Sequence, residues 1–410
     1  MHPLSLTPLD PRSREAESVR HADAAALAHA LTASRADTLA TFAVCMRQLA
    51  GADVPFADAL NPPLWELGHI GWFQSHWIAR NPQRALGQHA DPHALRSPAP
   101  RANADALYDS SRVAHASRWS LPFPDAEATR ADLAAQLETT LALLREAGAS
   151  DDGLYFHRLT LLHEDMHHEA ALYMAQALGL AIEDPRWQAS AIEDACAPLA
   201  FEAGTWRLGS EPAGFVFDNE LGAHPVALPA SVIDSRVVRW AEYLPFVEAG
   251  GYAQPQWWSE AGRAWLAAHQ TEAPRYLRRS NGAWQCWRHG RWSTLDPAHA
   301  ACFLTAFEAE AWCRWAGSRL PTEAEWERAA LERPGEFVWG EVWEWTASAF
   351  MPYPGFAAHP YREYSAVSFG HRRVLRGASF MTQPRMRHAR YRNFFSADRH
   401  DVPAGFRACR

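Results

Sequence analysis

Lysine is absent from the sequence, so all 39 side chains with a fixed positive charge are arginines. Alanine is abundant, and we attribute both features to codon usage in a GC-rich genome. The formal net charge is −8 at pH 7. A broad nucleic-acid-binding surface needs a clustered basic face. The acidic balance therefore argues against a nucleic-acid partner.

Long apolar runs and paired cysteines are absent as well. No stretch approaches the roughly 18 to 20 apolar residues of a membrane span, and residues 1–20 carry acids and prolines where a signal peptide has an apolar run. We therefore expect a cytoplasmic protein with no membrane partner. No C-x-x-C pair is present, which argues against a disulfide framework and a sulfur-ligated zinc site. The six cysteines are Cys45, Cys196, Cys286, Cys302, Cys313 and Cys409.

The first part of the chain is predicted to be helical. The composition of the whole chain is that of an ordinary globular protein, and its 410 residues suffice for two domains. Alanine- and leucine-rich segments without strand-like alternation, separated by proline-rich breaks, predict four helices that form a bundle over residues 1–182. These segments are residues 21–50, 63–80, 126–148 and 153–180.

The amino-acid composition and the hydrophobic pattern change after a predicted linker at residues 183–200. From residue 201 onward glycine, tryptophan and short apolar runs recur, and most of the 19 tryptophans lie in this part. Only two helices stand out there, at 238–249 and 305–317. The sequence therefore predicts an α+β multidomain protein, with a helical bundle followed by an irregular α+β domain over 201–410.

A histidine cluster lies near the end of the bundle. Residues 161–169 read LLHEDMHHE and contain the pattern H-E-x-x-H from His163 to His167. On a helix, residues four apart differ by about 40° around the axis, so these two rings face one side, as a metal site needs. Glu169 is rotated away and is expected to contact a metal ligand or a neighbouring helix. We expect His168 to face solvent.

A third ligand is expected from residues 61–78, NPPLWELGHIGWFQSHWI. His69 and His76 are seven residues apart and share one helix face. His69 lies beside Gly68 and near Gly71, a setting in which a neighbouring element can approach closely. A buried histidine without a partner would be costly there. We therefore favour His69 as the ligand and keep His76 as an alternative.

The pattern H-E-x-x-H is also typical of zinc peptidases, in which Glu164 would be the general base. The metzincin branch is excluded because Ala170 and Tyr173 replace its glycine and histidine. Glu183 or Glu193 stays open as a carboxylate ligand, but a peptidase leaves the second half of the chain unexplained. Three histidines equally suit ferrous iron with open positions for substrate and dioxygen. The spacing alone does not choose between the metals.

The second half resembles the sulfatase-modifying or formylglycine-generating-enzyme-like domain, which has a C-type-lectin-like fold. That family's catalytic cysteine pair is not evident here, so the resemblance implies the fold without copper-dependent formylglycine chemistry. The matching segments are AGTWRLGS (203–210), FDNE (217–220), FVEAGGY (246–252), EAEAWCRWAGSRLPTEAEWERAA (308–330), GEVWEWTAS (340–348), VLRGASF (374–380) and GFRACR (405–410).

A DinB-like bundle with WELGHIG (65–71) and the string from His163 to Glu169 precedes this domain. The combination resembles the ergothioneine-type sulfoxide synthases. It implies a nonheme iron(II) centre held by His69, His163 and His167, with dioxygen as co-substrate. The implied reaction joins a sulfur donor to the imidazole C2 of hercynine (trimethylhistidine).

Departures from that family concern the substrates. Members commonly have glutamine before the third ligand, where this chain has Met166, which cannot donate a hydrogen bond to the substrate imidazole. Asn393 and Phe394 occupy the positions that contact the betaine part of hercynine, where an aromatic face suits a quaternary ammonium. The next position, often an aspartate that helps to bind γ-glutamylcysteine, is Phe395. Arg399 is a further candidate for contact with the chalcogen donor.

Phe395, together with residues 107–126 in place of the usual donor-binding loop, makes the chain most similar to the selenoneine synthase branch. In that branch 1-seleno-N-acetylglucosamine is coupled to hercynine, and the selenoxide collapses to selenoneine. The alternative is the ergothioneine-type reaction with a thiol of cysteine or γ-glutamylcysteine. A hypothesis of another class makes the bundle a metal-binding or thiol-transfer module and the second half a lectin-like binder.

The family's proton donor is a tyrosine of the second domain. Residues 351–356, MPYPGF, supply Tyr353 as the predicted catalytic residue, with Tyr361 and Tyr364 as alternatives.

The arginine-rich run at 385–392, RMRHARYR, is too short to indicate nucleic-acid binding on an acidic chain. We expect its arginines to pair with acids such as Glu344 or Asp398 and to brace the pocket wall.

Overall fold

The computed structural model describes residues 10–51 and 53–410. Residues 1–9, which belong to the predicted first domain and to the stretch searched for a signal peptide, lie outside the described residues. Among the described helices, none has both the length and the apolar character that crossing a membrane would require.

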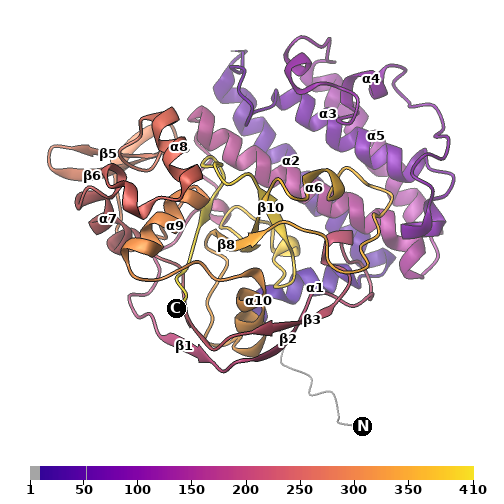
Figure 1. Cartoon of the computed structure of the whole chain (residues 1–410). Helices are drawn as coiled ribbons and strands as arrows, with labels where there is room; N and C mark the ends of the chain where they lie inside the picture. The colour runs from indigo at the N-terminus through magenta and orange to yellow at the C-terminus, as the bar shows by residue number, and fades with distance from the viewer. Residues whose placement is uncertain (1–9, 52) are drawn as a thin grey trace, which may run out of the picture.

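The first half consists of helices, as predicted (Figure 1). The side chains of Asp23, Asp125 and Ser150 accept hydrogen bonds from the first turns of the three longest helices, which begin at the next residue. The predicted helix 63–80 is α-helical only to Gln74 and continues as a π-helical turn at Ser75–Ala79. The helices are α1 Arg14–Arg20, α2 Ala24–Leu49, α3 Pro63–Gln74, α4 Ala104–Tyr108, α5 Ala126–Glu146 and α6 Asp151–Leu178.

The second half mixes short strands with four further helices. The prediction of two helices there was incomplete, because α8 and α10 were missed. The capping box of Thr322 and Glu325 at the start of α10 was a signal for it in the sequence. The helices are α7 Trp240–Glu248, α8 Glu260–His269, α9 Ala306–Trp315 and α10 Glu323–Glu332.

The central sheet of this half has the strand order β10-β9-β8-β11, with β11 parallel to β8 and the other pairs antiparallel. Smaller sheets pair β1 with β4, β2 with β3, and β5 through β7. β1 begins within the predicted linker 183–200. The strands are β1 Pro198–Phe201, β2 Gly204–Leu208, β3 His224–Leu228, β4 Ser231–Asp234, β5 Leu277–Ser280, β6 Ala283–Arg288, β7 Arg291–Thr294, β8 Trp343–Ala349, β9 Arg373–Gly377, β10 Asn393–Phe395 and β11 Ala404–Gly405.

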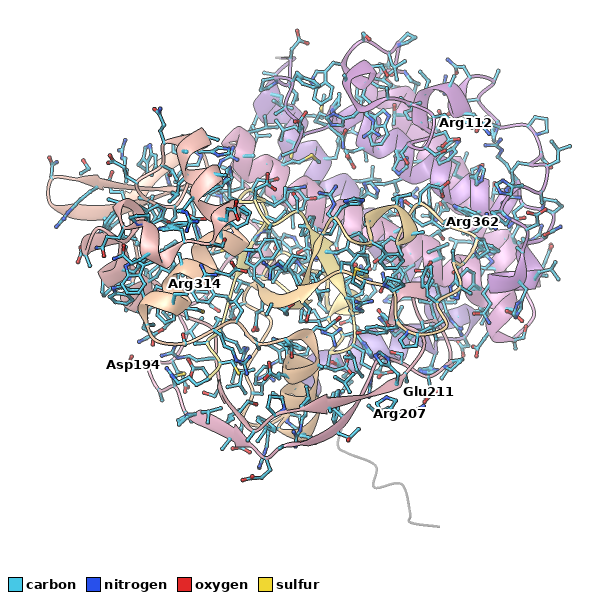
Figure 2. The ribbon with its side chains drawn as sticks, in the orientation of Figure 1. Arg112, Asp194, Arg207, Glu211, Arg314 and Arg362 are labelled. Atoms are coloured by element: carbon cyan, nitrogen blue, oxygen red, sulfur yellow. The ribbon has the colours of Figure 1, made fainter. Side chains whose placement is uncertain are left out.

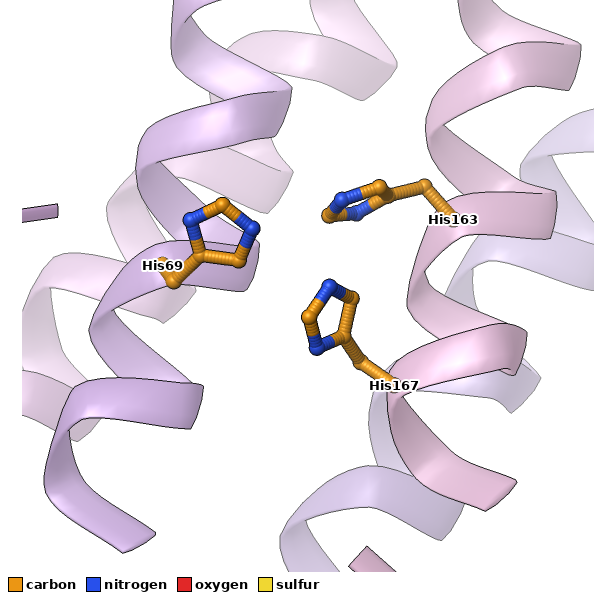
Figure 3. A group of neighbouring side chains, drawn as sticks. All are labelled: His69, His163 and His167. Carbon is orange, nitrogen blue, oxygen red and sulfur yellow. The ribbon is translucent and has the colours of Figure 1, made fainter. Parts of the chain in front are cut away.

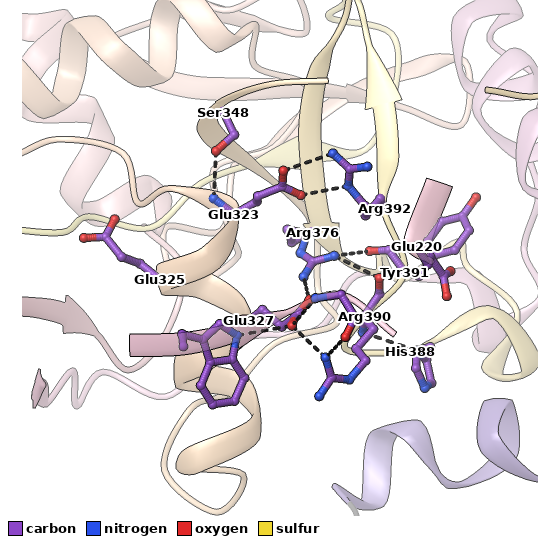
Figure 4. A network of polar contacts seen from close by, with 12 residues as sticks. Glu220, Glu323, Glu325, Glu327, Ser348, Arg376, His388, Arg390, Tyr391 and Arg392 are labelled. Carbon is purple, nitrogen blue, oxygen red and sulfur yellow. Dashed lines mark hydrogen bonds and ion pairs between the residues drawn. The ribbon is translucent and has the colours of Figure 1, made fainter. Parts of the chain in front are cut away.

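Buried arginine–glutamate pairs connect α10 to the central sheet (Figure 4). Arg392 donates to both oxygens of Glu323, at 2.9 and 3.0 Å. Arg376 and Arg390 both donate to Glu327, and the side chains of Arg376 and Glu327 are fully buried. A buried carboxylate keeps its charge only when such donors surround it. These pairs therefore hold the sheet in a defined position on α10.

The partners expected for the arginine run 385–392 were wrong. Glu344 is held by an arginine near the C-terminus, outside the run, and Asp398 accepts no hydrogen bond from the run. Arg385 instead donates to Asp165 on α6, at 2.8 and 2.9 Å. Arg390 and Arg392 pair with glutamates of α10, whereas Arg387 donates to the backbone carbonyls of Thr382 and Ser379. Helix α10 was not predicted, and two of its glutamates are the partners of Arg390 and Arg392. For this reason the acids expected from the sequence were the wrong ones.

The carboxylate of Glu169 on α6 joins the two halves. It accepts hydrogen bonds from Trp343 Nε1 at 2.8 Å and from the hydroxyls of Ser379 and Thr382, each at 2.6 Å. Burial raises the pKa of Glu169 although these three hydrogen bonds oppose the shift. Glu169 thus serves the contact with the second half.

The expectation that His168 faces solvent was wrong. The side chain is 1% exposed, its Nε2 lies 2.9 Å from Thr41 Oγ1, and Trp187 packs on its ring. Gln383 of the second half approaches its other nitrogen. The second half and the segment after α6 cover this face of the helix, which periodicity on a single helix cannot show.

A second connection between the halves is the buried pair of Arg20 on α1 with Glu220. The guanidinium donates to both carboxylate oxygens, at 2.6 and 2.9 Å, and both side chains are almost fully buried. Removing one partner of such a pair leaves an uncompensated buried charge.

We expect Arg20→Met to lower the free energy of unfolding by about 3 to 5 kcal/mol, because Glu220 loses its partner. The matched control is Arg207→Met, since Arg207 and Glu211 form a pair whose side chains are 63% and 61% exposed (Figure 2). That change should cost less than about 0.5 kcal/mol. Urea unfolding measures both, and equal midpoints for the two variants would contradict the prediction.

Candidate metal centre

Three histidines from two helices meet in the interior of the bundle (Figure 3). His69 comes from α3, and His163 and His167 come from successive turns of α6. One nitrogen of each ring lies within 4.8 Å of the others. The structure thus brings together the three residues that the sequence predicted as metal ligands.

The ring of His69 is held from its outer side. Its Nδ1 lies 2.8 Å from the carbonyl oxygen of Tyr108, so Nδ1–H donates and Nε2 is left to bind a metal. Trp65 stacks on the ring, with 4.7 Å between centroids and 8° between planes. A Cβ at Gly68 would lie 2.1 Å from the ring of Tyr108. Glycine at this position is therefore what lets Tyr108 approach α3.

The ring of His167 is held by a carboxylate. Its Nδ1 lies 2.6 Å from Oε2 of Glu66, which is 6% exposed. The other oxygen of Glu66 accepts a hydrogen bond from Asn61 Nδ2 at 2.6 Å. Burial alone would raise the pKa of Glu66, but the hydrogen bonds from His167 and Asn61 and the nearby histidine rings together outweigh it, so the pKa lies below its usual value. An ionised carboxylate at this place orients the ring and leaves Nε2 as the metal-binding atom.

His163 provides the test of whether these residues fit a metal. Both of its ring nitrogens are buried and lack a hydrogen-bond partner among the described residues, while Phe73 stacks on the ring at 3.5 Å. Buried polar atoms rarely stay unsatisfied. Burial lowers the pKa of His163 well below its usual value and that of His69 to about 3, so both rings are neutral. Neutral imidazole is the form that binds a transition metal, and the residues therefore fit such an ion.

His76 does not join this group. Its ring lies against Trp72 and Trp77, and its buried Nδ1 has no hydrogen-bond partner among residues 10–51 and 53–410. It is not one of the three residues whose nitrogens converge.

The geometry does not favour a peptidase. Glu164, which would have to be the general base, is 1% exposed and accepts two hydrogen bonds from Arg35, at 2.7 and 3.1 Å. Glu183 and Glu193 are exposed, and neither is grouped with the histidines. A general base must reach the metal-bound water, and the ion pair with Arg35 holds Glu164 in another role.

A cavity of about 330 Å³ opens beside His163 and His167, with walls from both halves of the molecule. Met166, Asn393, Phe394 and Phe395, all predicted to contact substrate, line it. Three further aromatic residues in the wall were not predicted as substrate contacts. They are Tyr173, Trp343 and Tyr391.

Polar contacts orient several groups in the cavity. The Asn393 side-chain oxygen accepts from the Phe394 amide at 2.9 Å, which leaves Nδ2 as a donor group with no partner in the described part of the chain. Met166 Sδ accepts a weak hydrogen bond from the hydroxyl of Tyr391 at 3.4 Å, and this hydroxyl lies 2.8 Å from that of Tyr364. Arg399 is not in the wall, because Asp401 holds it at 2.6 and 2.7 Å behind Phe395.

The structure places Tyr353 away from this cavity and corrects the expectation for it. Its hydroxyl donates to Glu323 at 3.0 Å, and the guanidinium of Arg392 lies 3.9 Å from its ring centroid. Tyr361 and Tyr364 line the cavity instead. The ring of Tyr361 lies 6.0 Å from that of His163. The loop between β8 and β9 turns back over α6 only after Tyr353, and this path is not readable from the sequence.

Comparisons with known proteins agree with both halves of the chain. Residues 189–341 and 337–410 match the model of the sulfatase-modifying factor enzyme 1-like domain. A hercynine oxygenase of Mycolicibacterium smegmatis is 31% identical, covering 85% of this chain and 90% of the relative. One of Mycobacterium tuberculosis is 30% identical, with the same 85% and 90% coverage. A formylglycine-generating enzyme of Thermomonospora curvata is 35% identical over 32% of this chain and 48% of its own length.

These matches and the arrangement of helices and strands in the structure confirm the predicted fold class. A helical N-terminal region precedes an α+β domain of the formylglycine-generating-enzyme type, and the matched region starts at residue 189, within the predicted linker.

The lowered pKa of His69 predicts how the stability of the metal-free protein depends on pH. In the unfolded chain a histidine takes up a proton near pH 6.5, whereas buried His69 stays neutral down to about pH 3. Between these values the unfolded state binds more protons, so stability falls as pH falls. We expect His69→Asn to reduce the slope of unfolding free energy against pH between 6.5 and 4.5. Urea unfolding across this range measures it, and parallel curves would refute the assignment.

Proposed function

Because the chain belongs to the hercynine oxygenase family, we propose that it is an iron(II)- and dioxygen-dependent enzyme acting on hercynine. The proposed reaction couples 1-seleno-N-acetylglucosamine to the imidazole C2 of hercynine, on the path to selenoneine. The observation that carries the proposal is the convergence of three imidazoles, two of them buried, beside an aromatic cavity built by both halves.

In this proposal His69, His163 and His167 hold the iron through their nitrogens. Three nitrogen ligands leave open positions on an octahedral ion. When bound there, iron(II) would bring a chalcogenolate and dioxygen together and activate the dioxygen. The protein holds hercynine beside them, which removes much of the entropic barrier to a reaction of three molecules.

Hercynine is proposed to lie along the aromatic wall. Its trimethylammonium group suits aromatic ring faces, and Phe394 offers one that is fixed by stacking on Phe350 at 4.1 Å. The free Nδ2 group of Asn393 can donate to the carboxylate of the betaine. Met166 cannot donate to the substrate imidazole, so the imidazole must be oriented by shape and by the tyrosines around it.

The charge of the cavity favours a neutral chalcogen donor. Among the described residues that line it there is no arginine, and with no lysine in the chain no other fixed cation is available. γ-Glutamylcysteine carries two carboxylates, which would be desolvated there without a cationic partner. Phe395 occupies the position at which members of the similar family often have an aspartate that helps to bind γ-glutamylcysteine. Arg399 is already paired with Asp401. A sugar needs only hydrogen bonds.

The proposed reaction balances with one dioxygen. The selenol loses one hydrogen and hercynine loses the hydrogen on C2, a carbon–selenium bond forms, one oxygen atom ends on selenium and the other leaves as water. Elimination of the sugar as an unsaturated sugar would turn this selenoxide into a selenenic acid, and two electrons from a thiol reductant would then give selenoneine and water. The proton needed by the departing oxygen is proposed to come from Tyr361, whose pKa is raised by burial so that the phenol stays protonated. Tyr364 suits this role less, because its hydroxyl is engaged with Tyr391.

The test is an anaerobic titration of the metal-free protein with iron(II), followed by hercynine and one donor under air. We expect dioxygen uptake and a product with the mass of the coupled selenoxide or selenoneine when the donor is the selenosugar. Uptake with γ-glutamylcysteine or cysteine alone would instead establish the ergothioneine-type reaction. No uptake with any donor would reject the proposal and favour a binding module, and peptide cleavage with zinc would revive the peptidase. His163→Ala, which removes one proposed ligand, is the negative control.

We expect Tyr361→Phe to lower kcat by about 100- to 10,000-fold, the usual range for loss of a general acid, while iron(II) binding is kept. Tyr353→Phe is the matched control, because this hydroxyl faces Glu323 and not the cavity. Its kcat should change less than about threefold on the same reasoning. Steady-state dioxygen uptake measures both, and a loss in Tyr353→Phe with normal turnover in Tyr361→Phe would reverse the assignment.

A further inference from the structure

Arg118 lies outside the bundle but touches the supports of two proposed metal ligands. It belongs to a short 3-10 turn, His115–Trp119, within residues 107–126. Its guanidinium carbon lies 3.7 Å from the ring centroid of Trp65. Its Nη1 donates to Asn61 Oδ1 at 2.8 Å. Neither neighbour is a metal ligand, and each leads to a different one.

The first route runs through stacked rings to His69. Arg118 covers one face of Trp65, and Trp65 stacks almost parallel on His69, with 4.7 Å between centroids. A guanidinium over an indole face is attracted by the ring and restricts its tilt. Because the two rings are parallel, a tilt of Trp65 would have to move His69 as well.

The second route is a chain of hydrogen bonds to His167. Arg118 donates to Asn61, Asn61 donates to one oxygen of Glu66 at 2.6 Å, and the other oxygen of Glu66 accepts from His167 Nδ1 at 2.6 Å. The amide of Asn61 is held at both ends, so its orientation is defined. Arg118 also places a positive charge near the buried carboxylate of Glu66.

We propose that Arg118 is a positioning residue for the metal centre, which orients His69 through Trp65 and His167 through Asn61 and Glu66. The inference rests on the proposed function only in that the three histidines hold a metal ion. Groups that hold metal ligands in place affect metal affinity about 10- to 100-fold when removed. Residues 107–126 also contain Tyr108, whose carbonyl accepts from His69. This segment therefore braces the centre at three points.

The probe is cobalt(II), titrated into the metal-free protein and followed by its absorption bands. We expect Arg118→Met, which keeps an aliphatic stem over Trp65 but removes the donor, to raise the Kd for cobalt(II) about 10- to 100-fold and to change the band intensities. Asn61→Ala should weaken binding to a similar extent by the second route alone. Arg112→Met is the matched control, since Arg112 lies in the same segment, is 81% exposed and, among the described residues, forms its ion pair with Asp109 (Figure 2).

A Kd and spectrum unchanged within about twofold in both Arg118→Met and Asn61→Ala, against the 10-fold minimum expected for such a group, would overturn the proposal. So would an equal loss in Arg112→Met. If Arg118→Met does not fold, Arg118→Lys decides: lysine keeps the charge but cannot both cover the indole and donate to Asn61 in one plane, so weakened cobalt(II) binding supports the proposal and wild-type binding refutes it.

The proton shared by His167 Nδ1 and Glu66 gives a reading that needs no metal. In metal-free protein labelled with ¹⁵N-histidine, its resonance should shift in Arg118→Met and in Asn61→Ala and stay unchanged in Arg112→Met. A wild type that binds no cobalt(II) or iron(II) would refute the proposed function, and this resonance would then decide the role of Arg118. A wild type that binds metal but couples no donor would refute the proposed reaction and leave Arg118 to be judged by cobalt(II) affinity.

Discussion

The convergence of three histidine rings, of which those of His69 and His163 are buried and neutral, is the constraint on which the rest of the structure depends. His163 has no hydrogen-bond partner for either ring nitrogen among the described residues, and a protein without something to bind there would lose free energy at this place. The arrangement requires α3 and α6 to lie close together and the outer nitrogens of His69 and His167 to be held. Tyr108 and Glu66 meet that requirement, and Gly68 leaves the space for the first of them.

The second half completes the site because it is attached to the same helix that carries two of the histidines. Glu169, two residues after His167, accepts three hydrogen bonds from the second half and so places Trp343 in the cavity wall. Behind that wall, buried arginines donate hydrogen bonds to both oxygens of a carboxylate, as Arg392 does to Glu323. A planar guanidinium fits such a pair and an ammonium does not. A chain with arginine as its only fixed cation is therefore well suited to this interior.

The sequence could predict what depends on one helix or one motif, and it failed where the answer depends on how elements pack. Spacing on α6 paired His163 with His167, and the glycines of α3 favoured His69 over His76; the structure brings these three rings together. The solvent-facing role expected for His168 was wrong because Gln383 and Trp187, distant in sequence, cover that face. Glu66 stood within the quoted motif WELGHIG, but only the fold shows that it receives His167. No local signal connects Arg118 to the centre, because the connection runs through Trp65 and Asn61.

The division of the site between two halves explains how a substrate could change while the metal centre is kept. The proposed ligands belong to α3 and α6, whereas Asn393, Phe394 and Phe395 belong to β10, so replacing a residue of β10 alters the wall without moving a ligand. Met166 is the exception, since it lines the cavity and directly precedes His167. A bulky or charged residue there would act on both functions at once. Methionine at this position cannot donate a hydrogen bond, and its sulfur accepts one from Tyr391 of the second half. A change at residue 166 therefore also changes the surroundings of that tyrosine. Reorienting the substrate imidazole thus requires changes in both halves of the cavity wall.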